Sequence, residues 1–502
     1  MPDYVIVGAG SAGCVLAGRL SEDANTSILL LEAGPRDTRT EIHIPAAFSK
    51  LFKTEVDWCY YTEDQPNLCG RKLYWPRGKM LGGCSSMNAM IWIRGNPQDY
   101  ERWRELGAVG WCWDCVRTVF DRLEPLATHQ RCVNPLSNAF IEACIERGIP
   151  RTSDFNGPEP YGCGPYRVTQ KSGRRLSAAA AYLKPARNRK NLRIETGAHA
   201  TKILFERDRA IGVEYVQQGS THQVRANREV LLSGGAINSP QLLLLSGIGP
   251  AGDLQRLNIP VVADVPGVGQ NLQDHLCLPV AYECTQPVSL ANAESALNLI
   301  RYIAGGRGPL TSNVAEAGAF PREHPALQFH FGPGWFLEHG FRRPAGHGFT
   351  LGPTLIRPKS RGSIRLRNRN PFLAPAIDPR YLSESADRAG MLTGLALARE
   401  IAAAKAFDPF RGAEASPGAH IRSNEALNEY LENNLETLYH PVGTCKIGSD
   451  DLAVVDGYLQ VRGVTALRVI DASVMPEITS GNTNAPTLMI AEKAATMLRA
   501  SS

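Results

Sequence analysis

The sequence predicts an α/β fold, α+β overall, in which a Rossmann-like nucleotide-binding domain is interleaved with a second domain. Residues 3–34 read as strand, glycine turn, helix and strand, and residues 229–249 repeat the strand, turn and helix. Residues 327–366 instead carry short strand patterns without a phosphate-type loop, which predicts an antiparallel sheet flanked by helices. At 502 residues the chain exceeds the roughly 250–300 residues at which single cores stop growing, so two domains are expected.

The first glycine turn has the spacing of a dinucleotide-binding motif. Val5–Val7 form an apolar run typical of a strand buried on both faces, and Gly8, Gly10 and Gly13 follow as G-x-G-x-x-G. The first glycine permits the tight turn, the second lets the backbone approach a pyrophosphate, and the third lets the helix pack against the strand. The phosphates are expected at the helix N-terminus.

An acidic residue ends the second predicted strand. Ile28–Leu31 form that strand, and Glu32 follows Gly13 by 19 residues (32 − 13). This is the spacing at which such folds place the carboxylate that binds a ribose hydroxyl. The context of strand, turn, helix and strand makes chance glycines a poor explanation.

Composition excludes several classes of protein. The hydrophobic content of 43% and charged content of 21% are typical of a globular enzyme, and the net charge of +5 gives no reason to expect a nucleic-acid partner. No run approaches the ~18 apolar residues of a membrane span, and no signal peptide precedes the first strand, so we expect a cytoplasmic protein. The twelve cysteines form no disulfide framework, and Cys112-x-x-Cys115 stands without a second pair, so no metal site is expected.

The predicted domains alternate along the chain. We assign residues 1–150 to the first part of the nucleotide-binding domain, with a loop near 35–65 that covers a pocket, and 151–189 to an excursion into the substrate domain. Residues 190–283 return to the nucleotide-binding domain, 284–437 form the substrate domain, and 438–502 complete the first domain.

Individual elements follow from local patterns. Residues 192–194, 202–205 and 212–216 suit a small meander, and residues 327–331, 349–356 and 362–366 suit the antiparallel sheet beside a helix at 391–404. Leu467–Asp471 reads as a final buried strand. Pro486, with Asn484 two residues before it, predicts the start of a helix that runs to about Arg499.

A second glycine-rich stretch lies at residues 75–95. Gly78, Gly82 and Gly83 stand with the small residues of 84–86, which lets backbone run close to a flat ligand and offer amide donors to it. Asn88 adds a side-chain donor and acceptor. Taken alone, this stretch reads equally well as a tight packing turn.

Several separated motifs, in order, carry a resemblance that covers essentially the whole chain. They are Gly8–Gly13 with Glu32, Gly78–Asn88, Gly235–Pro240 through Ser246–Gly249, Tyr439–Cys445, and Asp471–Pro476 leading to Gly481–Pro486. On these motifs the chain resembles the glucose-methanol-choline (GMC) family of FAD-dependent oxidoreductases, of the choline dehydrogenase and aryl-alcohol oxidase kind.

The resemblance implies that FAD is the cofactor. Glu32 would bind the adenosine ribose, the first glycine loop the pyrophosphate, and the Gly82–Asn88 stretch the isoalloxazine ring. Some members link the flavin covalently through a histidine at the position of Met87, and a thioether offers no comparable nitrogen, so non-covalent FAD is expected. The expected cofactor contacts are Gly8, Gly10, Ser11, Ala12, Gly13, Glu32, Ala33, Gly78, Gly82, Gly83, Ser86, Asn88, Ala89, Asp471, Ala472, Asn482, Thr483 and Asn484.

The resemblance also implies that His440 and Asn484 are the catalytic pair. Alcohol oxidation needs a base for the hydroxyl proton and an acceptor for the hydride, and flavin N5 accepts hydride. A histidine with an ordinary pKa of ~6.5 can take that proton near neutrality, while an asparagine holds the same oxygen without charge. The expected reaction is therefore oxidation of a primary alcohol to the aldehyde.

The substrate is less closely defined. Trp335, Phe336 and Tyr439 are candidate pocket residues that suit an aryl or medium apolar alcohol. Glu316 resembles the carboxylate that choline-oxidising members place against a trimethylammonium group, although a buried acid with a partner elsewhere is the favoured alternative.

Three further alternatives stay open. Leu438 would crowd the flavin face where oxygen reacts, which slightly favours a dehydrogenase with a dye- or quinone-type acceptor over an oxidase. A cyanohydrin lyase would hold FAD structurally. An NAD-binding protein would explain only the first 34 residues and leave the C-terminal motifs without a role.

Overall fold

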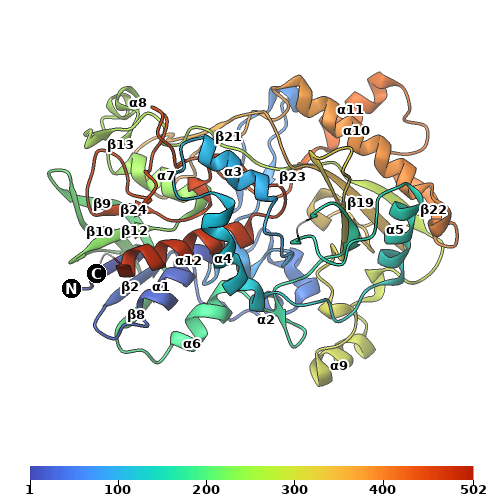
Figure 1. The fold of residues 1–502 in the computed structure, drawn as a ribbon, viewed down its shortest axis with the longest axis horizontal. Helices are drawn as coiled ribbons and strands as arrows, with labels where there is room; N and C mark the ends of the chain where they lie inside the picture. The colour runs from blue at the N-terminus through green and yellow to red at the C-terminus, as the bar shows by residue number, and fades with distance from the viewer. Residues whose placement is uncertain (158, 501–502) are drawn as a thin grey trace.

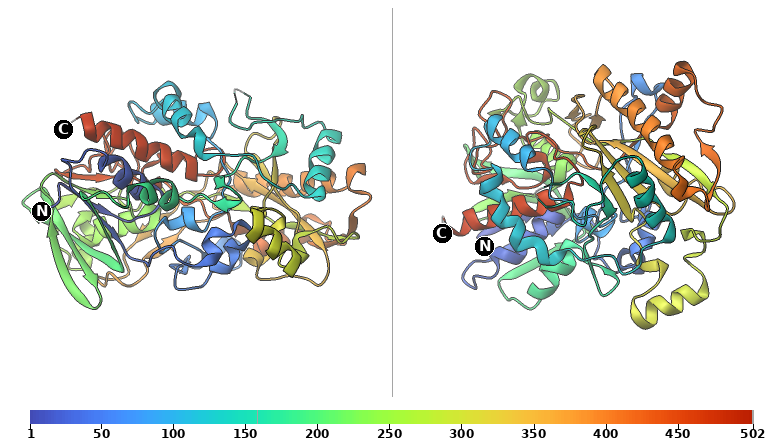
Figure 2. Two further views of the ribbon diagram at one scale, coloured as in Figure 1. Left: turned by 90° about the horizontal axis from the view of Figure 1, so that it is seen from below. Right: turned by 45° about the vertical axis from the view of Figure 1, so that its right-hand side comes forward.

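The computed structural model describes residues 1–157 and 159–500. Figure 1 shows a parallel sheet at one end of the long dimension and an antiparallel sheet at the other. Both termini lie at the end of the parallel sheet, in this view and in both views of Figure 2.

The parallel sheet has five strands in the order β24-β12-β1-β2-β8. The strands are β1 (Tyr4–Val7), β2 (Ile28–Glu32), β8 (Leu192–Thr196), β12 (Glu229–Leu232) and β24 (Leu467–Val469). β1 and β2 are buried along their whole length, as apolar strands covered on both faces should be. Because the chain enters this sheet in three separate stretches, the predicted interleaving of two parts is confirmed.

Three helices follow strands of this sheet. α1 (Ser11–Leu20) follows β1, α7 (Gly235–Leu245) follows β12, and α12 (Asn484–Ala500) follows β24 after an irregular segment and packs on α1. The last helix thus starts at Asn484, near the start predicted from Asn484 and Pro486. Parallel strands share one carboxyl edge, so the turns after β1, β12 and β24 meet there. The Gly235 amide donates to the Asp471 carboxylate across this edge at 2.8 Å.

A three-stranded antiparallel meander lies beside the parallel sheet. It consists of β9 (Ala198–Glu206), β10 (Arg209–Gln217) and β11 (Ser220–Arg225). The prediction that residues 192–194 belong to this meander was wrong, because they form β8 and pair in parallel with β2. Gly197, with a φ of +66°, separates β8 from β9, and a short alternating run does not reveal which sheet it will join.

The antiparallel sheet has eight strands, with the main path β22-β16-β19-β18-β17-β5, with β15 paired to β19 and with β23 paired to β15. The strands are β5 (Gly162–Pro165), β15 (Leu276–Cys277), β16 (Val280–Cys284), β17 (Ala317–Phe320), β18 (Leu327–Gly332), β19 (Gly348–Leu355), β22 (Arg411–Ser416) and β23 (Glu436–Thr437). Around it lie α5 (Pro135–Glu146), α10 (Ser385–Ala402) and α11 (Asn424–Asn434), of which α5 contacts β5 and β17 and α10 contacts β19. The predicted sheet and helix near 391–404 are thus present.

Two details of that sheet differ from expectation. The strand expected at 362–366 is β20 (Ser363–Arg365), which pairs with β21 (Ala376–Asp378) outside the large sheet. β16 and α5 belong with the antiparallel sheet, although the predicted boundaries at 283 and 150 placed them with the nucleotide-binding part. Alternation along a strand shows a buried face but does not identify the partner strand.

The remaining elements connect these layers. The helices are α2 (Thr40–His43), α3 (Pro97–Glu105), α4 (Trp113–Leu123), α6 (Lys184–Ala186), α8 (Ala251–Arg256) and α9 (Ala296–Gly305). The short strands are β3 (Tyr60–Tyr61), β4 (Tyr74–Trp75), β6 (Gln170–Lys171), β7 (Arg174–Arg175), β13 (Ile248–Gly249) and β14 (Ala263–Asp264), and the 3-10 helices used below are η1 (Pro45–Leu51), η3 (Gly83–Ser86) and η7 (Pro309–Thr311).

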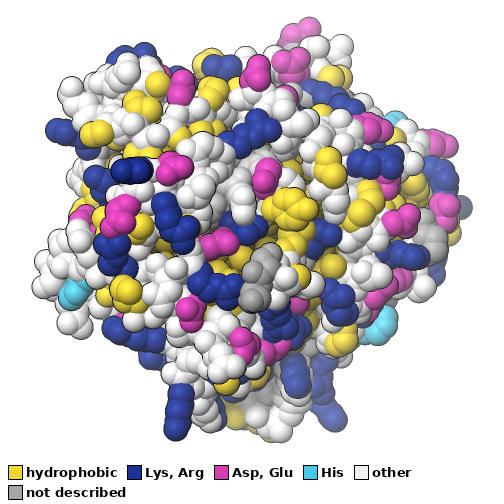
Figure 3. Space-filling model, turned by 60° about the vertical axis from the view of Figure 1, so that its left-hand side comes forward, with side chains coloured by type: hydrophobic (Ala, Val, Ile, Leu, Met, Phe, Trp, Pro, Cys, Tyr) yellow, Lys and Arg dark blue, Asp and Glu magenta, His cyan; other side chains and the backbone are white. Residues whose placement is uncertain are grey.

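Charges of both signs are mixed over the face drawn in Figure 3, where Lys and Arg alternate with Asp and Glu. None of the helices in the described part of the chain is long and apolar enough to span a bilayer. All twelve cysteines are free thiols.

Candidate active site

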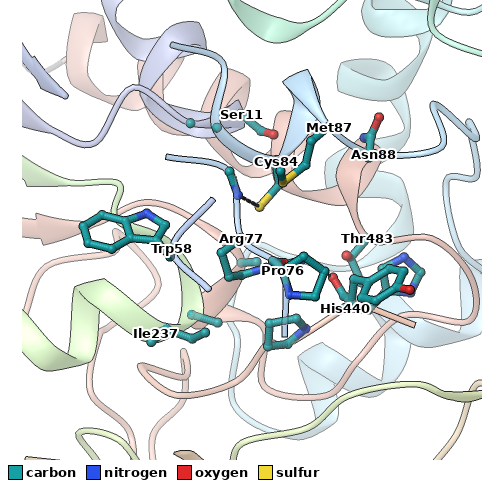
Figure 4. A pocket seen from close by; sticks show the side chains of 18 of the residues that line it. Ser11, Trp58, Pro76, Arg77, Cys84, Met87, Asn88, Ile237, His440 and Thr483 are labelled. Carbon is teal, nitrogen blue, oxygen red and sulfur yellow. Dashed lines mark hydrogen bonds between the residues drawn. The ribbon is translucent and has the colours of Figure 1, made fainter. Parts of the chain in front are cut away.

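A cavity of about 330 Å³ joins the two sheets. One half is lined by the carboxyl edge of the parallel sheet, including Gly8 and Glu32, and the other by the antiparallel sheet, including His330 and Thr350. In Figure 4, Trp58 lies at one side of the view and His440 with Thr483 at the other, with Cys84 and Met87 above them. A long ligand in this cavity would touch both halves of the protein.

The first glycine turn is shaped by close backbone contacts. Gly8 has a φ of +96°, and a Cβ on it would lie 2.5 Å from the Ser233 carbonyl oxygen, so only glycine fits. A Cβ on Gly13 would lie 1.9 Å from the Gly8 oxygen, which is the close helix-to-strand packing expected of that position. At Gly10 the nearest atom to such a Cβ is 3.9 Å away, so this residue leaves open space on the cavity wall.

The Glu32 carboxylate lies at the end of β2 on the cavity wall. It accepts hydrogen bonds from the backbone N–H groups of Ala9 and Gly34, each at 2.8 Å. Burial raises the pKa of Glu32 to about 7, against the opposing effect of these two amide donors. The carboxylate is therefore fixed in place beside the phosphate-type turn, as a ribose-binding acid would need to be.

The second glycine stretch packs directly on the first. A Cβ on Gly83 would lie 2.7 Å from the Gly10 Cα, so the two turns approach to backbone contact. The Gly78 amide donates to the Cys84 sulfur at 3.4 Å, the bond drawn in Figure 4, and holds η3 in its tight conformation. Met87 follows η3 and lines the cavity.

Most of the predicted cofactor residues line this cavity. They are Gly8, Gly10, Ser11, Ala12, Glu32, Ala33, Gly78, Gly83, Asn88, Ala89, Asp471, Ala472, Asn482, Thr483 and Asn484. Gly13, Gly82 and Ser86 lie behind the wall instead. Gly82 adopts a φ of +88°, and the Ser86 hydroxyl donates to the Leu81 carbonyl at 2.8 Å, so these residues shape the loop.

His440 is held from two sides by adjacent residues of the 266–275 loop. Its backbone N–H donates to the Asp274 carboxylate at 2.7 Å, and its Nδ1 lies 2.9 Å from His275 Nδ1. Asp274 also accepts from the Thr437 and Tyr381 hydroxyls, each at 2.5 Å, which ties the segment before His440 to the same carboxylate. The position of the ring is therefore fixed by both backbone and side-chain contacts.

The other ring nitrogen of His440 faces Asn482. The Asn482 amide nitrogen lies 3.4 Å from His440 Nε2, and its oxygen lies 3.4 Å from the Gln328 amide. The N–H donor facing Nε2 favours this nitrogen as the acceptor and the ring proton on Nδ1, directed at His275. Burial, followed by the charges of His275, His330 and Arg77, holds the pKa of His440 well below its usual range, so the imidazole is neutral at neutral pH.

The structure corrects the expected pairing of His440 with Asn484. The Asn484 side-chain oxygen accepts a hydrogen bond from the Ser11 hydroxyl at 2.8 Å, across the starts of α12 and α1. Asn482, two residues earlier and outside the helix, is the asparagine beside His440. The expectation failed because both residues are asparagines, and only the point at which α12 begins decides which one faces the histidine.

The predicted substrate residues divide into two groups. Phe336 and Tyr439 line the cavity, with Phe48 and Phe52 from the covering segment of residues 35–65. Trp335 and Glu316 do not line it. The Glu316 carboxylate is buried and accepts from the Ser312 and Ser137 hydroxyls and the Asn134 backbone amide, at 2.6, 2.8 and 2.7 Å, so it is the buried structural acid of the favoured alternative and does not form the choline contact of the other.

Sequence reasoning missed three residues of this site, namely His275, His330 and Arg77. His330 and Gln328 lie two positions apart on β18, so both face the cavity side while Phe329 and Phe331 pack in the core. A polar alternation inside the apolar run LQFHF was the signal available. His275 gave no such signal, because only the folded loop brings it to His440.

Family models match most of the chain. The models for the GMC oxidoreductase N- and C-terminal parts match residues 2–277 and 358–491. The chain belongs to the GMC oxidoreductase family.

Curated relatives of this GMC protein match over its whole length. It is 45% identical to alcohol dehydrogenase (acceptor) of Pseudomonas putida, with 99% of this chain and 96% of the relative aligned. It is also 45% identical to the mitochondrial choline dehydrogenase of Homo sapiens, with 99% and 89% aligned. These relatives support an oxidoreductase, and their names are consistent with alcohol oxidation.

Solved structures of GMC enzymes have the same fold. Pyridoxine 4-oxidase from Mesorbium loti superposes with a TM-score of 0.92 at 34% identity, covering 100% of this chain and 99% of that one. Formate oxidase from Aspergillus oryzae, studied for its FAD modification, superposes with a TM-score of 0.93 at 26% identity, covering 100% and 98%. The Rossmann-like part with its antiparallel partner sheet is thus the FAD-binding fold of this family.

Proposed function

We propose that this protein oxidises a primary alcohol to the aldehyde with non-covalent FAD, His440 acting as the base and Asn482 orienting the hydroxyl. One observation carries the proposal. His440 Nε2 lies beside an amide nitrogen at the junction between the glycine-lined half of the cavity and the His330 half. A hydroxyl placed there would meet a neutral proton acceptor and a neutral donor together.

The residues present fit FAD. The open wall at Gly10, the carboxylate of Glu32 and the amide-rich start of α12 match a pyrophosphate, a ribose and a flavin edge. FAD, when bound, supplies the hydride acceptor. The protein would hold it through Gly10, Ser11 and Glu32 on one side and through the backbone of Gly83, Asn88 and Thr483 on the other.

The residues around the hydroxyl would each do one task. His440 Nε2 would take the hydroxyl proton, and the Asn482 amide would donate to the same oxygen, as its present contact to Nε2 is long enough to be exchanged. His330 lines the cavity on the substrate side, and burial lowers its pKa to about 4, so it would present a neutral ring to the substrate.

Aromatic side chains support an aryl or medium apolar alcohol as the substrate. The cavity is lined by Phe48, Phe52, Phe336 and Tyr439, and Phe48 and Phe336 are in ring contact, with centroids 6.2 Å apart. A choline-type amino alcohol is the second candidate. The carboxyl group of Glu436 on the same wall favours this substrate, because a carboxylate could pair with the cationic amine. Burial raises the pKa of Glu436 to about 7, so the group is only partly charged near neutrality and is a weaker counter-ion.

The proposal predicts that an accepted alcohol bleaches the flavin of the purified enzyme under anaerobic conditions. A panel of benzylic, aliphatic, furanic and amino alcohols, followed at the flavin absorption band, would identify the substrate class. A lyase that holds FAD structurally would keep its colour with every alcohol and release aldehyde from a cyanohydrin, which would reject the proposed reaction.

The same alcohol then separates a dehydrogenase from an oxidase. Leu438 lines the cavity two residues before His440, which supports a dehydrogenase by crowding the space where oxygen would react. Dye reduction without peroxide is the expected result. Peroxide in equal amount to the aldehyde would reverse this preference.

Non-covalent binding predicts that acid precipitation releases all the yellow colour into the supernatant. Met87 lies on the cavity wall after η3, and its thioether offers no nitrogen for a flavin bond. Colour retained in the protein pellet would show that another side chain has formed the link.

A further inference from the structure

α9 carries an unpartnered apolar surface on the outside of the molecule. None of its residues is buried, and Leu297, Ile300 and Ile303 are 58%, 63% and 75% exposed. The helix stands at the edge of the molecule in Figure 1 and projects from it in the right-hand view of Figure 2. Leaving several large aliphatic side chains in water on one helix is costly, and such patches mark interaction surfaces.

These side chains share one face of the helix. At about 100° per residue, Leu297, Leu299, Ile300 and Ile303 fall within an arc of roughly 160°. The opposite side carries Asn298 and Tyr302, both half-buried, and the Tyr302 hydroxyl donates to the His43 carbonyl at 3.2 Å. The helix is thus fixed to the protein by its polar side, and the apolar face points outward.

Basic side chains surround the apolar face. Arg301 and Arg307 are exposed on and just after α9, and the hairpin of β6 and β7 brings Lys171 and Arg174 to its C-terminal end, where Gly173 packs on Gly306. No acidic residue lies between Ser295 and Gly308, and Glu294 just before the helix is paired with Lys50 at 2.8 Å. Among the described residues, none of these four cations forms an ion pair within the chain. The surroundings of the patch are therefore positively charged.

We propose that the outward face of α9 docks this protein on an anionic lipid bilayer. Aliphatic residues would enter the boundary between headgroups and acyl chains, while Arg301, Arg307, Lys171 and Arg174 would contact acidic headgroups. The helix would lie on the surface, in agreement with the lack of a spanning helix in the described chain. The docking does not depend on the proposed reaction.

A second copy of the chain fits this surface less well. Symmetric pairing would bring Arg301 and Arg307 of two copies together, and one helix of 10 residues is small against the roughly 800 Å² per partner of a stable interface. Interface hot spots also favour Trp, Tyr and Arg, whereas this face is made of Leu and Ile. A bilayer needs neither a large area nor shape complementarity.

The position of α9 connects the bilayer with the cavity. The helix contacts η7, which in turn contacts η1 of the covering segment, and the Lys50–Glu294 ion pair joins η1 to the segment just before the helix. Phe48 on η1 lines the cavity. Docking through α9 would place the covering segment near the lipid surface, where an apolar alcohol or a lipid-soluble electron acceptor would be concentrated.

Vesicle sedimentation of the full-length holoenzyme tests the proposal. The protein should pellet with vesicles of phosphatidylglycerol and phosphatidylcholine at low salt, and far less with pure phosphatidylcholine or at high salt. Ile300→Ser with Ile303→Ser should weaken binding about tenfold or more, and each of Arg301→Gln and Arg307→Gln should weaken it roughly fivefold. The matched control is Val109→Ser with Leu452→Ser, which removes two exposed apolar side chains elsewhere and should bind like the unmodified protein.

Flavin content, thermal unfolding and dye reduction in free solution should be the same in all these variants, because α9 is not part of the cavity wall. The proposal fails if the unmodified protein stays in the supernatant with anionic vesicles, or if the isoleucine variant binds as the control does. It also fails if light scattering finds a dimer that only the isoleucine variant converts to monomer, since the face would then be a subunit interface.

Discussion

Replacing His440 with alanine is expected to slow reduction of the bound flavin by an alcohol about 10²–10⁴-fold, the usual contribution of a positioned general base. Nε2 of His440 is the proton acceptor that the geometry presents to the cavity, and alanine removes it. FAD content should be unchanged, because the glycine turns and Glu32 lie in the other half of the cavity. Stopped-flow measurement of flavin bleaching gives the rate directly.

The pH dependence of the same rate is a second readout. Because the pKa of His440 is held well below its usual range, the base stays neutral as the pH falls. The rate of flavin reduction in the unmodified enzyme should therefore be constant down to about pH 6.5, the ordinary histidine value, and decrease only at lower pH. An alanine variant that is reduced at the unmodified rate would remove His440 as the base.

Asn482→Ala is expected to lower the rate of flavin reduction by about 5–150-fold, the effect of losing a buried hydrogen bond of about 1–3 kcal/mol. The matched variant is Asn484→Ala, two residues along the chain. Because Asn484 bonds the Ser11 hydroxyl at the start of α1, this change should weaken FAD binding and leave the reduction rate of fully loaded enzyme nearly unchanged.

Comparing the two variants at saturating FAD distinguishes the roles. Equilibrium titration with FAD and stopped-flow reduction are both needed, since a loss of cofactor would imitate a loss of rate. If Asn484→Ala slows reduction of loaded enzyme more than Asn482→Ala does, the original pairing of His440 with Asn484 is the correct one and the geometry at Asn482 is not catalytic.

Fully apolar strands and glycine turns could be predicted because their patterns are local. Val5–Val7 and Gly8–Gly13 fix a buried strand and its turn through their own sequence, and the final helix has a proline near its start. Short alternating strands were placed less well, as residues 192–194 and 363–365 show. Their partners are chosen by packing between distant segments, which no single stretch encodes.

The site residues likewise divide into those that local spacing predicts and those that depend on distant segments of the chain. The sequence spacing of the glycines and Glu32 indicates which residues lie beside them in the fold. The position of the His440 ring instead depends on Asp274 and His275, more than 160 residues earlier. Glu316 shows why the structural alternative was favoured there, because the carboxylate at this suggestive position has only structural partners. A residue type at a motif position does not fix the direction of its side chain.

The contact between His275 and His440 has a consequence for the path of the proton. His275 is completely buried, and its outer nitrogen, Nε2, makes no hydrogen bond within the described residues. In the proposed reaction, a proton taken up at His440 Nε2 would therefore find no side-chain relay beyond His275, and it would return to solvent through the cavity by which the alcohol entered. Release of the aldehyde and deprotonation of His440 would use the same opening of the cavity. A slowly released product would therefore also delay the next proton transfer.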